Sequence, residues 1–189
     1  MDTLTILGIC GSLRKDSYNK KLLSFAQKTI GKDAVIETVE IGNLPFFSQE
    51  VEGNPPDVVV TFREKIKAAD ALFFVTPEYN YSLPGVVKNA IEWGSRPYAT
   101  AVLHKKPVAI MGASNGMLGT GRAQYHFRQM CVQTDMLILN RPEAMIPFVQ
   151  EKFDAQGNLV DQKTKDKVKE LLDALIDWTK KLKSAGLEL

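Results

Sequence analysis

The sequence predicts an α/β fold of three layers: a doubly wound, five-stranded parallel sheet with helices on both faces. Short apolar runs alternate along the 189 residues with segments whose apolar positions recur at helical spacing. The runs at Leu4–Cys10 and Ala71–Thr76 contain no charged residue, which is typical of central parallel strands covered on both sides. Because crossovers between parallel strands are right-handed, successive helices are expected on both faces of the sheet.

The first strand leads through a polar loop into the first helix. Leu4–Cys10 ends at Gly11, and the segment Lys20–Ile30 carries apolar side chains at helical spacing. Ala34–Ile41 then alternates apolar with charged side chains, which predicts a second strand nearer an edge of the sheet. The loop Gly42–Pro56 contains three prolines and is long enough to be functional.

The middle of the chain continues the alternation of strand and helix. A second helix is expected from Asp57, whose carboxylate is suited to cap it, to Ala69. The third strand, Ala71–Thr76, precedes a third helix that has Pro84 in its first turn and extends through Trp93.

The second half of the chain completes the sheet and covers it. The expected elements are a fourth strand at Lys106–Ala113, a helix after Gly121 that runs through Cys131, a fifth strand at Met136–Leu139, a mixed segment Pro142–Asn158 and a final amphipathic helix from about Asp161 to Lys183. The sequence contains no internal repeat or interdomain linker, so a single domain over residues 1–189 is predicted.

Composition excludes several classes of function. The net charge of +2 and the absence of charged blocks argue against a nucleic-acid partner, and no apolar run is long enough to span a membrane. Cys10 and Cys131 form no C-x-x-C pair, and His104 and His126 are the only histidines, so neither a disulfide scaffold nor a metal site is expected. No signal peptide is expected before the first strand, and two buried thiols would fit the reducing cytoplasm.

The loop between the first strand and the first helix is predicted to bind phosphate. A helix N-terminus offers free backbone N–H groups and a positive dipole end, and this loop adds the side chains of Ser12, Arg14, Ser17 and Asn19. Neither the nucleoside-triphosphate P-loop nor the dinucleotide G-x-G-x-x-G pattern is present, so a terminal phosphomonoester is the better match. Alternatively, Ser17 or Asn19 only caps the helix.

Two further loops are expected beside it. In doubly wound sheets ligands bind outside the carboxyl ends of the strands, where the loops Pro77–Ser82 and Ser114–Gly121 also begin. The first of these contains Tyr79, Asn80 and Tyr81, and the second is rich in glycine, which lets backbone N–H groups approach a ligand closely. Together the three loops suit a mononucleotide with a flat ring.

Two segments carry a resemblance to a known family. The sequences GSLRKDSYNKKL at Gly11–Leu22 and TPEYNYSLPGVVKNAIEW at Thr76–Trp93 resemble the NAD(P)H-dependent FMN reductases of flavodoxin-like fold, and among them the bacterial chromate and quinone reductases. The resemblance extends from Leu4 to about Pro147. It implies the strand order 2-1-3-4-5, a tightly bound FMN, and a homodimer or a homotetramer of paired dimers.

The resemblance also assigns residues. It places the FMN phosphate on Ser12, Arg14, Ser17 and Asn19, with Tyr18 in the same motif. It assigns the flavin ring and ribityl contacts to Pro77, Glu78, Tyr79, Asn80 and Tyr81, and to Ser114 and Gly116 to Gly119 on the third loop. It further implies that Arg122, Tyr125 and Glu143 form a polar network between subunits.

The function implied is two-electron transfer from NADH or NADPH through FMN to an acceptor such as a quinone, a nitro or azo compound, chromate or free flavin. No catalytic side chain is required, because the cofactor supplies the reactive ring. Two alternatives are a flavodoxin-type carrier of single electrons, which a net charge of +2 disfavours, and a mononucleotide-binding module without turnover. A cyclic-nucleotide or phosphosugar enzyme should show acid–base residues in these loops, and only Glu78 is present. Glu78 is expected either to contact the ligand or to act as a cap, and His126 to lie on a helix surface or interface.

Overall fold

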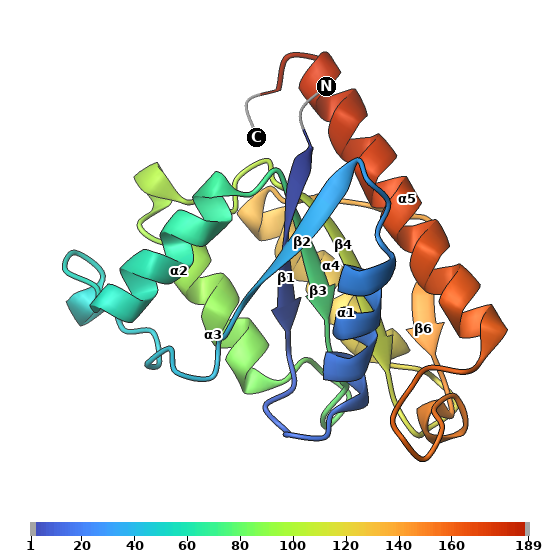
Figure 1. The fold of residues 1–189 in the computed structure, drawn as a ribbon. Helices are drawn as coiled ribbons and strands as arrows, with labels where there is room; N and C mark the ends of the chain where they lie inside the picture. Colours follow the sequence, from blue (N-terminus) through green and yellow to red (C-terminus); the bar gives the residue numbers. More distant parts are fainter. Residues whose placement is uncertain (1–2, 188–189) are drawn as a thin grey trace.

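The structure, a computed structural model, describes residues 3–187 and confirms the doubly wound parallel sheet (Figure 1). The strands, in sheet order, are β2 (Ala34–Val39), β1 (Leu4–Cys10), β3 (Ala71–Val75), β4 (Pro107–Ala113) and β5 (Leu137–Ile138), with β6 (Ala144–Ile146) also paired with β4. Every pairing between these strands is parallel.

Five α-helices connect and cover these strands. They are α1 (Tyr18–Thr29), α2 (Asp57–Ala68), α3 (Gly85–Gly94), α4 (Gly121–Thr134) and α5 (Gln162–Ser184). Short 3-10 helices occur at Gln49–Val51, Tyr98–Thr100 and Val149–Glu151.

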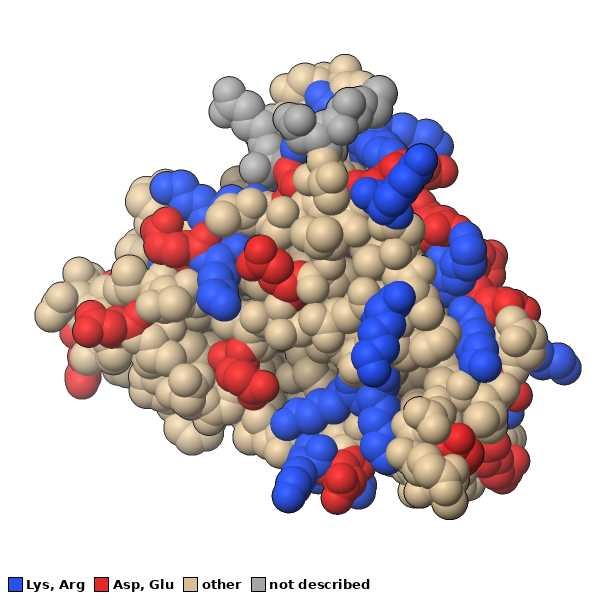
Figure 2. All heavy atoms as spheres, in the orientation of Figure 1, with Lys and Arg blue, Asp and Glu red and all other residues tan. Residues whose placement is uncertain are grey.

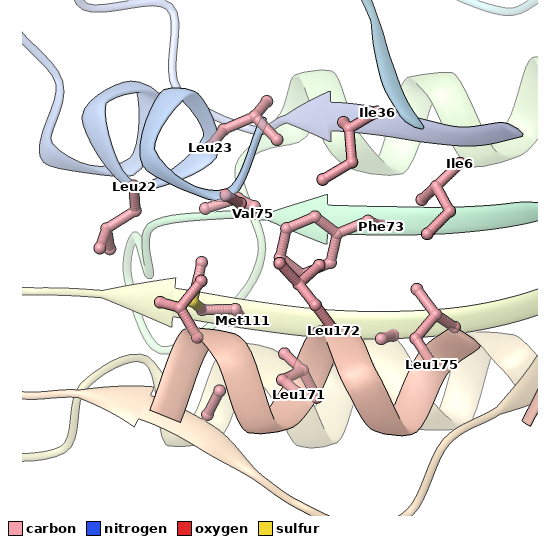
Figure 3. Close-up of a cluster of buried hydrophobic side chains, with 14 of the residues drawn as sticks. Ile6, Leu22, Leu23, Ile36, Phe73, Val75, Met111, Leu171, Leu172 and Leu175 are labelled. Carbon is pink, nitrogen blue, oxygen red and sulfur yellow. The ribbon is translucent and has the colours of Figure 1, made fainter. Parts of the chain in front are cut away.

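Helices α1 and α5 cover one face of the sheet. Leu22 and Leu23 of α1 and Leu172 of α5 are buried in one apolar cluster with strand residues such as Phe73 and Met111 (Figure 3). The single long stripe of apolar residues on α5 therefore packs along the sheet, as its helical spacing predicts.

Helices α2, α3 and α4 cover the opposite face. Phe62 of α2, Trp93 of α3 and Phe127 of α4 are almost fully buried in a second apolar cluster. The rings of Phe74 on β3 and Phe127 lie 4.7 Å apart between their centroids. Both faces of the central strands are thus apolar, which explains their continuous hydrophobic runs.

The fifth strand differs from the prediction. Only Leu137–Ile138 of the expected Met136–Leu139 forms a strand, and the same edge of β4 continues its pairing with Ala144–Ile146. Pro142 lies between the two short strands, and a proline has no backbone N–H to donate to a sheet. The edge is therefore divided in two, and β6 was missed within a segment expected to be mixed.

Helix α2 begins as predicted but is capped differently. Asp57 is its first residue rather than its cap, and the N-cap Pro56 has no side-chain hydrogen bond. The carbonyl of Pro56 accepts from the backbone N–H groups of Val59 and Val60 at 2.8 and 3.1 Å. Asp57 instead places its negative charge in the first turn, beside the positive end of the helix dipole.

The loop between β2 and α2 is anchored to α3. The indole N–H of Trp93 donates to the Pro45 carbonyl at 2.7 Å, and the Asn89 side chain accepts from the Phe47 N–H at 2.8 Å. The Phe47 ring also meets the Trp93 ring edge-on at 5.1 Å. These contacts hold most of the loop against the helix while Phe46 stays exposed.

No helix in the described part of the chain is long and apolar enough to cross a membrane. Within residues 3–187, no group of three or more His, Cys, Asp or Glu side chains is arranged to hold a metal ion.

Candidate functional site

The three predicted loops meet at one edge of the sheet. The strands they follow are neighbours, since Cys10 of β1 pairs with Val75 of β3, and Val75 in turn with Met111 of β4. A Cβ atom added to Gly11 would lie 2.6 Å from a methyl carbon of Val87 and would also collide with Thr76. The side chains of Thr76 and Val87 therefore pack against the Gly11 backbone more closely than a larger residue would allow.

The loop before α1 presents unpaired backbone donors. The Gly11 N–H still donates to the Val75 carbonyl at 2.9 Å, but none of the N–H groups of residues 12–18 donates to another described residue. The Ser17 hydroxyl caps the helix by accepting from the N–H groups of Asn19 and Lys20 at 3.2 and 3.4 Å. Free donors at the N-terminal end of a helix form an anion-binding site.

Two side chains of this loop are free to join those donors. Ser12 is only 3% exposed, yet its hydroxyl makes no hydrogen bond with a described residue. The exposed Arg14 likewise has no hydrogen-bond or ion-pair partner within residues 3–187. Figure 2 shows Lys and Arg side chains gathered over α1 and the loop that precedes it, and such a cluster attracts anions.

The Asn19 side chain is bonded to the end of β4. Its side-chain amide donates to the Ala113 carbonyl and accepts from the Ala113 N–H, both at 3.0 Å, and the residue is buried. Asn19 thus joins α1 to the end of β4. Tyr18, in turn, packs its ring against Phe153 at 5.2 Å between centroids.

The second loop is a tight turn with an unusual backbone. The Tyr79 and Ser82 backbones exchange two hydrogen bonds of 2.9 Å around Asn80 and Tyr81, whose φ angles are 49° and 68°. Two successive positive φ angles define a type I′ turn, which glycine and asparagine favour and tyrosine adopts reluctantly. The N–H groups of Glu78, Asn80 and Tyr81 donate to no described residue.

The side chains of this turn divide into two groups. Tyr79 and Tyr81 are 47% and 65% exposed at the strand ends, where a flat ligand would lie. Glu78 instead faces α4: its carboxylate accepts from the Ala123 N–H at 3.1 Å and from the Arg122 guanidinium at 3.3 Å. Glu78 therefore acts as a cap for α4, one of the two roles that the sequence left open.

The third loop requires glycine at position 119. Gly119 has a φ of 52°, and a Cβ atom there would lie 2.6 Å from the Ile146 backbone nitrogen. The Ser114 hydroxyl donates to the Gly116 carbonyl at 3.2 Å. None of the N–H groups of residues 115–120 donates to a described residue, so this loop adds a second row of free backbone donors.

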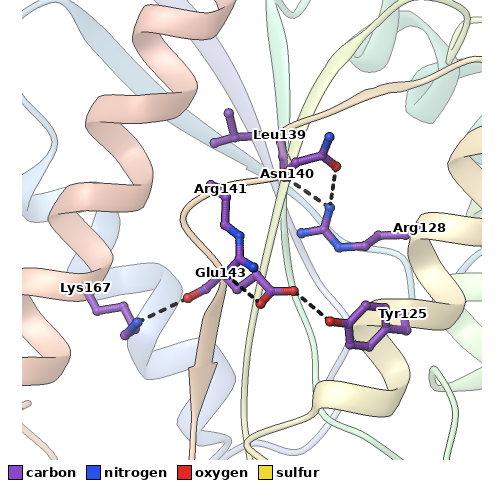
Figure 4. A network of polar contacts seen from close by, with 7 residues as sticks. All are labelled: Tyr125, Arg128, Leu139, Asn140, Arg141, Glu143 and Lys167. Atoms are coloured by element: carbon purple, nitrogen blue, oxygen red, sulfur yellow. Dashed lines mark hydrogen bonds and ion pairs between the residues drawn. The ribbon is translucent and has the colours of Figure 1, made fainter.

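A polar network joins α4, the segment before β6, and α5. The Glu143 carboxylate accepts from the Tyr125 hydroxyl at 3.2 Å and from the Arg141 guanidinium at 3.1 Å, and the Lys167 ammonium donates to the Glu143 carbonyl at 3.2 Å (Figure 4). Arg122 does not join it within the chain, because its guanidinium contacts Glu78.

A cavity of about 640 Å³ lies between α3 and α4 and adjoins the second loop. Ser82 of the turn lines it together with Leu83, Lys88, His126 and Met130. The Ser82 hydroxyl and His126 Nδ1 are 2.9 Å apart, a contact that sequence reasoning missed because nothing in the local pattern signals it. Apart from Ser82, the residues of the three loops do not line this cavity.

The donor set fits FMN. A phosphomonoester requires N–H and hydroxyl donors and a cation, which residues 12–18, Ser12 and Arg14 supply. A flavin ring offers carbonyl oxygens and ring nitrogens along an edge, and free N–H groups in the second and third loops are available to them.

Comparison with known proteins gives concordant results. A family model described as NADPH-dependent FMN reductase matches residues 4–151. The chain is 48% identical over 184 residues to an NAD(P)H-dependent FMN reductase of Pseudomonas aeruginosa, covering 96% of this chain and 98% of that protein. It is 40% identical over 177 residues to a 2-hydroxy-1,4-benzoquinone reductase of a Burkholderia species, covering 94% and 97%. The solved structure of FerB, a flavoenzyme NAD(P)H:(acceptor) oxidoreductase from Paracoccus denitrificans, superimposes with a TM-score of 0.88 at 35% identity, covering 95% and 98%.

Proposed function

Because the chain belongs to the NADPH-dependent FMN reductase family and is an FMN-dependent oxidoreductase that uses NAD(P)H, we propose that its electron acceptors are quinones. The observation that carries this proposal is the pair of exposed tyrosines, Tyr79 and Tyr81, at the sheet edge where the three loops meet. Both rings are exposed and lie next to backbone N–H groups that donate to no described residue, so a flat aromatic acceptor can reach them. The near full-length similarity to a benzoquinone reductase supports the same acceptor class.

Different residues bind different parts of the cofactor in this proposal. We assign the phosphate to the N–H groups of residues 12–18, the Ser12 hydroxyl and the Arg14 guanidinium, while Ser17 and Asn19 fix the loop. When bound, FMN supplies the hydride-accepting ring through which electrons pass from reduced nicotinamide to the acceptor.

The second and third loops complete this assignment. We assign the flavin ring to the turn that follows Pro77, with Tyr79 and Tyr81 as aromatic contacts and the Asn80 N–H as a donor. We also assign flavin contacts to Ser114 and Gly116 to Gly119 of the third loop, where the N–H groups of residues 115–120 donate to no described residue. No catalytic side chain is assigned, because the protein groups bind, orient and shield the ring.

A spectroscopic experiment tests the function directly. The purified chain is loaded with FMN and mixed without oxygen with NADH or NADPH, and the visible absorbance of the flavin is followed before and after a benzoquinone is added. We expect bleaching by reduced nicotinamide and recovery on addition of the quinone. A yellow protein that neither nucleotide bleaches would indicate an electron carrier, and a chain that takes up no FMN would indicate another function. Steady-state rates across quinone, chromate, nitro, azo and free-flavin acceptors then rank the acceptor classes.

We extend the proposal to assembly as a homodimer or homotetramer. Tyr125 is more than half exposed, and Glu143 joins it in the network beside the site. Such a surface can exchange hydrogen bonds with a second copy, and Arg122 adjoins it on α4. Sedimentation of the unmodified chain and of Tyr125→Phe tests this, since loss of the hydroxyl should shift the mass distribution toward smaller species. An unchanged distribution for the variant would exclude Tyr125 from the contact.

We also propose a cytoplasmic location. Cys10 and Cys131 are free thiols, and burial raises the pKa of both, that of Cys131 to about 12. Protonated, buried thiols persist unmodified in a reducing compartment. Fractionation of cells that produce the tagged chain tests this, and recovery in the membrane or secreted fraction would contradict it.

A further inference from the structure

We propose that Glu78 and Arg122 are positioning residues for the flavin ring, because they fix the Tyr79–Ser82 turn against the first turn of α4. This inference rests on the proposed function, since it concerns how the same site sets the properties of its cofactor.

The Glu78 carboxylate makes the first contact between the turn and α4. The Thr120 hydroxyl, at the N-cap of α4, accepts from the Gln124 side-chain amide at 3.1 Å but caps no backbone N–H, so the helix lacks a side-chain cap from its own sequence. Glu78 supplies it from the loop after β3: one carboxylate oxygen accepts from the Ala123 N–H at 3.1 Å and the other from the Arg122 guanidinium at 3.3 Å. The Glu78 side chain is only 12% exposed, and a negative charge at this helix end is favourable.

Two further contacts join α4 to Tyr81 and Ser82 of the turn. The Arg122 guanidinium carbon lies 3.8 Å from the centroid of the Tyr81 ring, a cation–π contact. His126 Nδ1 lies 2.9 Å from the Ser82 hydroxyl. Asn favours a positive φ angle but Tyr does not, so these contacts support the strained conformation at Tyr81 in addition to the two backbone hydrogen bonds of the turn.

A fixed turn has a consequence for redox chemistry. The N–H groups of Asn80 and Tyr81 have no partner among the described residues and are available to the acceptor atoms of a flavin. Reduction makes those ring atoms richer in electrons, so a donor held in place binds the reduced form more strongly than the oxidised form. Loosening the turn should therefore weaken the binding of FMN and lower its reduction potential.

The experiment compares Glu78→Ala and Glu78→Gln with the unmodified chain. The control is Asp173→Ala, which removes a carboxylate paired with Lys169 on α5, remote from the three loops. FMN affinity is measured by titrating the FMN-free protein and following flavin fluorescence. The midpoint potential is measured at saturating FMN, so that occupancy does not enter.

We expect Glu78→Ala to bind oxidised FMN at least tenfold more weakly. We further expect a tenfold larger loss for reduced FMN than for oxidised FMN, which corresponds to a potential about 30 mV more negative for a two-electron couple. Glu78→Gln keeps an oxygen that can accept from the Ala123 N–H and should recover most of both losses, whereas Asp173→Ala should change neither quantity.

Unchanged affinity and potential in Glu78→Ala would overturn the inference and leave Glu78 as a helix cap alone. If that variant does not fold, Arg122→Gln decides, because it keeps the bond between Glu78 and Ala123 but removes the guanidinium from Tyr81. A lowered potential in Arg122→Gln supports the inference, and a wild-type potential overturns it. Failure of the unmodified chain to bind FMN would instead overturn the proposed function itself.

Discussion

At the scale of single residues, some side chains of the loop before α1 have no partner in the described chain, and others make hydrogen bonds within it. Arg14 is exposed without a partner, whereas Ser17 caps α1 and Asn19 is bonded to Ala113. Substituting a free side chain should change ligand binding alone. Substituting an engaged one should change the stability of the protein even without ligand.

Arg14→Ala should weaken FMN binding by about 1.5–3 kcal/mol, because it removes a charge-assisted contact to the phosphate. The stability of the FMN-free protein should not change, since Arg14 has no partner in the described chain. The measurement is a fluorescence titration of FMN, with Lys32→Ala, an exposed cation in the turn before β2, as the control. Equal affinities for Arg14→Ala and the unmodified chain would remove Arg14 from the phosphate site.

Tyr79→Ala should lower the rate of turnover and leave stability within about 0.5 kcal/mol of the unmodified chain. The ring is 47% exposed, and the hydrogen bonds of the turn come from the backbone, which alanine retains. Tyr98→Ala is the matched control, because Tyr98 is similarly exposed but lies in a 3-10 helix away from the three loops. A large loss of thermal stability with normal kinetics would show that the Tyr79 ring serves packing instead.

At the scale of elements, the site depends on how α1 and α4 are held against the strand ends. Asn19 fixes α1 to β4, and Glu78 caps α4 from the loop after β3. In each case a side chain forms hydrogen bonds with backbone groups of a different element. The secondary-structure propensity of the local sequence cannot provide such bonds.

Asn19→Ala should destabilise the FMN-free protein by about 1–3 kcal/mol, because the N–H and carbonyl of Ala113 lose a buried partner. Urea unfolding measures this, with Asn54→Ala at an exposed loop position as the control. Normal stability together with weakened FMN binding would indicate that Asn19 is a direct phosphate ligand, as the sequence motif first implied.

Asp161→Ala should destabilise the protein by about 1 kcal/mol at neutral pH, because the Asp161 carboxylate caps α5 by accepting from the Thr164 N–H at 2.9 Å. Hydrogen bonds from Thr164 hold the pKa of Asp161 below its ordinary value of 3.8. The contribution is therefore complete above pH 3.8 and is lost as the pH falls through the lowered pKa of the folded state.

The measurement is chemical unfolding of both proteins at several pH values, with Glu170→Ala at an exposed position on the same helix as the control. The difference in unfolding free energy between the unmodified chain and Asp161→Ala should shrink at acidic pH. A difference that stays constant down to the lowest pH would show that the charge of Asp161 does not act in the cap.

Local pattern predicted the elements that bury continuous apolar runs. The bounds of β1 and β3 lie within a residue of the prediction, because both strands are covered on two faces and carry no charge. The divided edge formed by β5 and β6 was not predicted, since strands of two and three residues are too short to show a period. Their position is set by pairing with β4 rather than by their own sequence.

In the candidate site, too, local sequence patterns predicted some features, and the fold alone determines others. The three loops were predicted because each follows a recognisable strand, and parallel strands bring their carboxyl ends to one edge. The partners of Asn19 and Glu78 were not predicted, because those contacts join residues 94 and 45 positions apart. Only the fold brings these residues together.

At the scale of the whole molecule, one edge of the sheet gathers the free donors of three loops. Backbone N–H groups of residues 12–18 and 115–120 are unpaired there among the described residues, and the turn at Tyr79–Ser82 lies between the strands that these loops follow. The helices on both faces hold the strand ends in register, so the fold itself prepares the site for a flat cofactor with an anionic tail.

The crystal structure of the chain with FMN tests this most directly. We predict that the phosphate lies within hydrogen-bond distance of the N–H groups of residues 12–18, with the flavin ring against the turn at Tyr79–Ser82. Density for FMN in another place, such as the cavity between α3 and α4, with the three loops unoccupied, would contradict it.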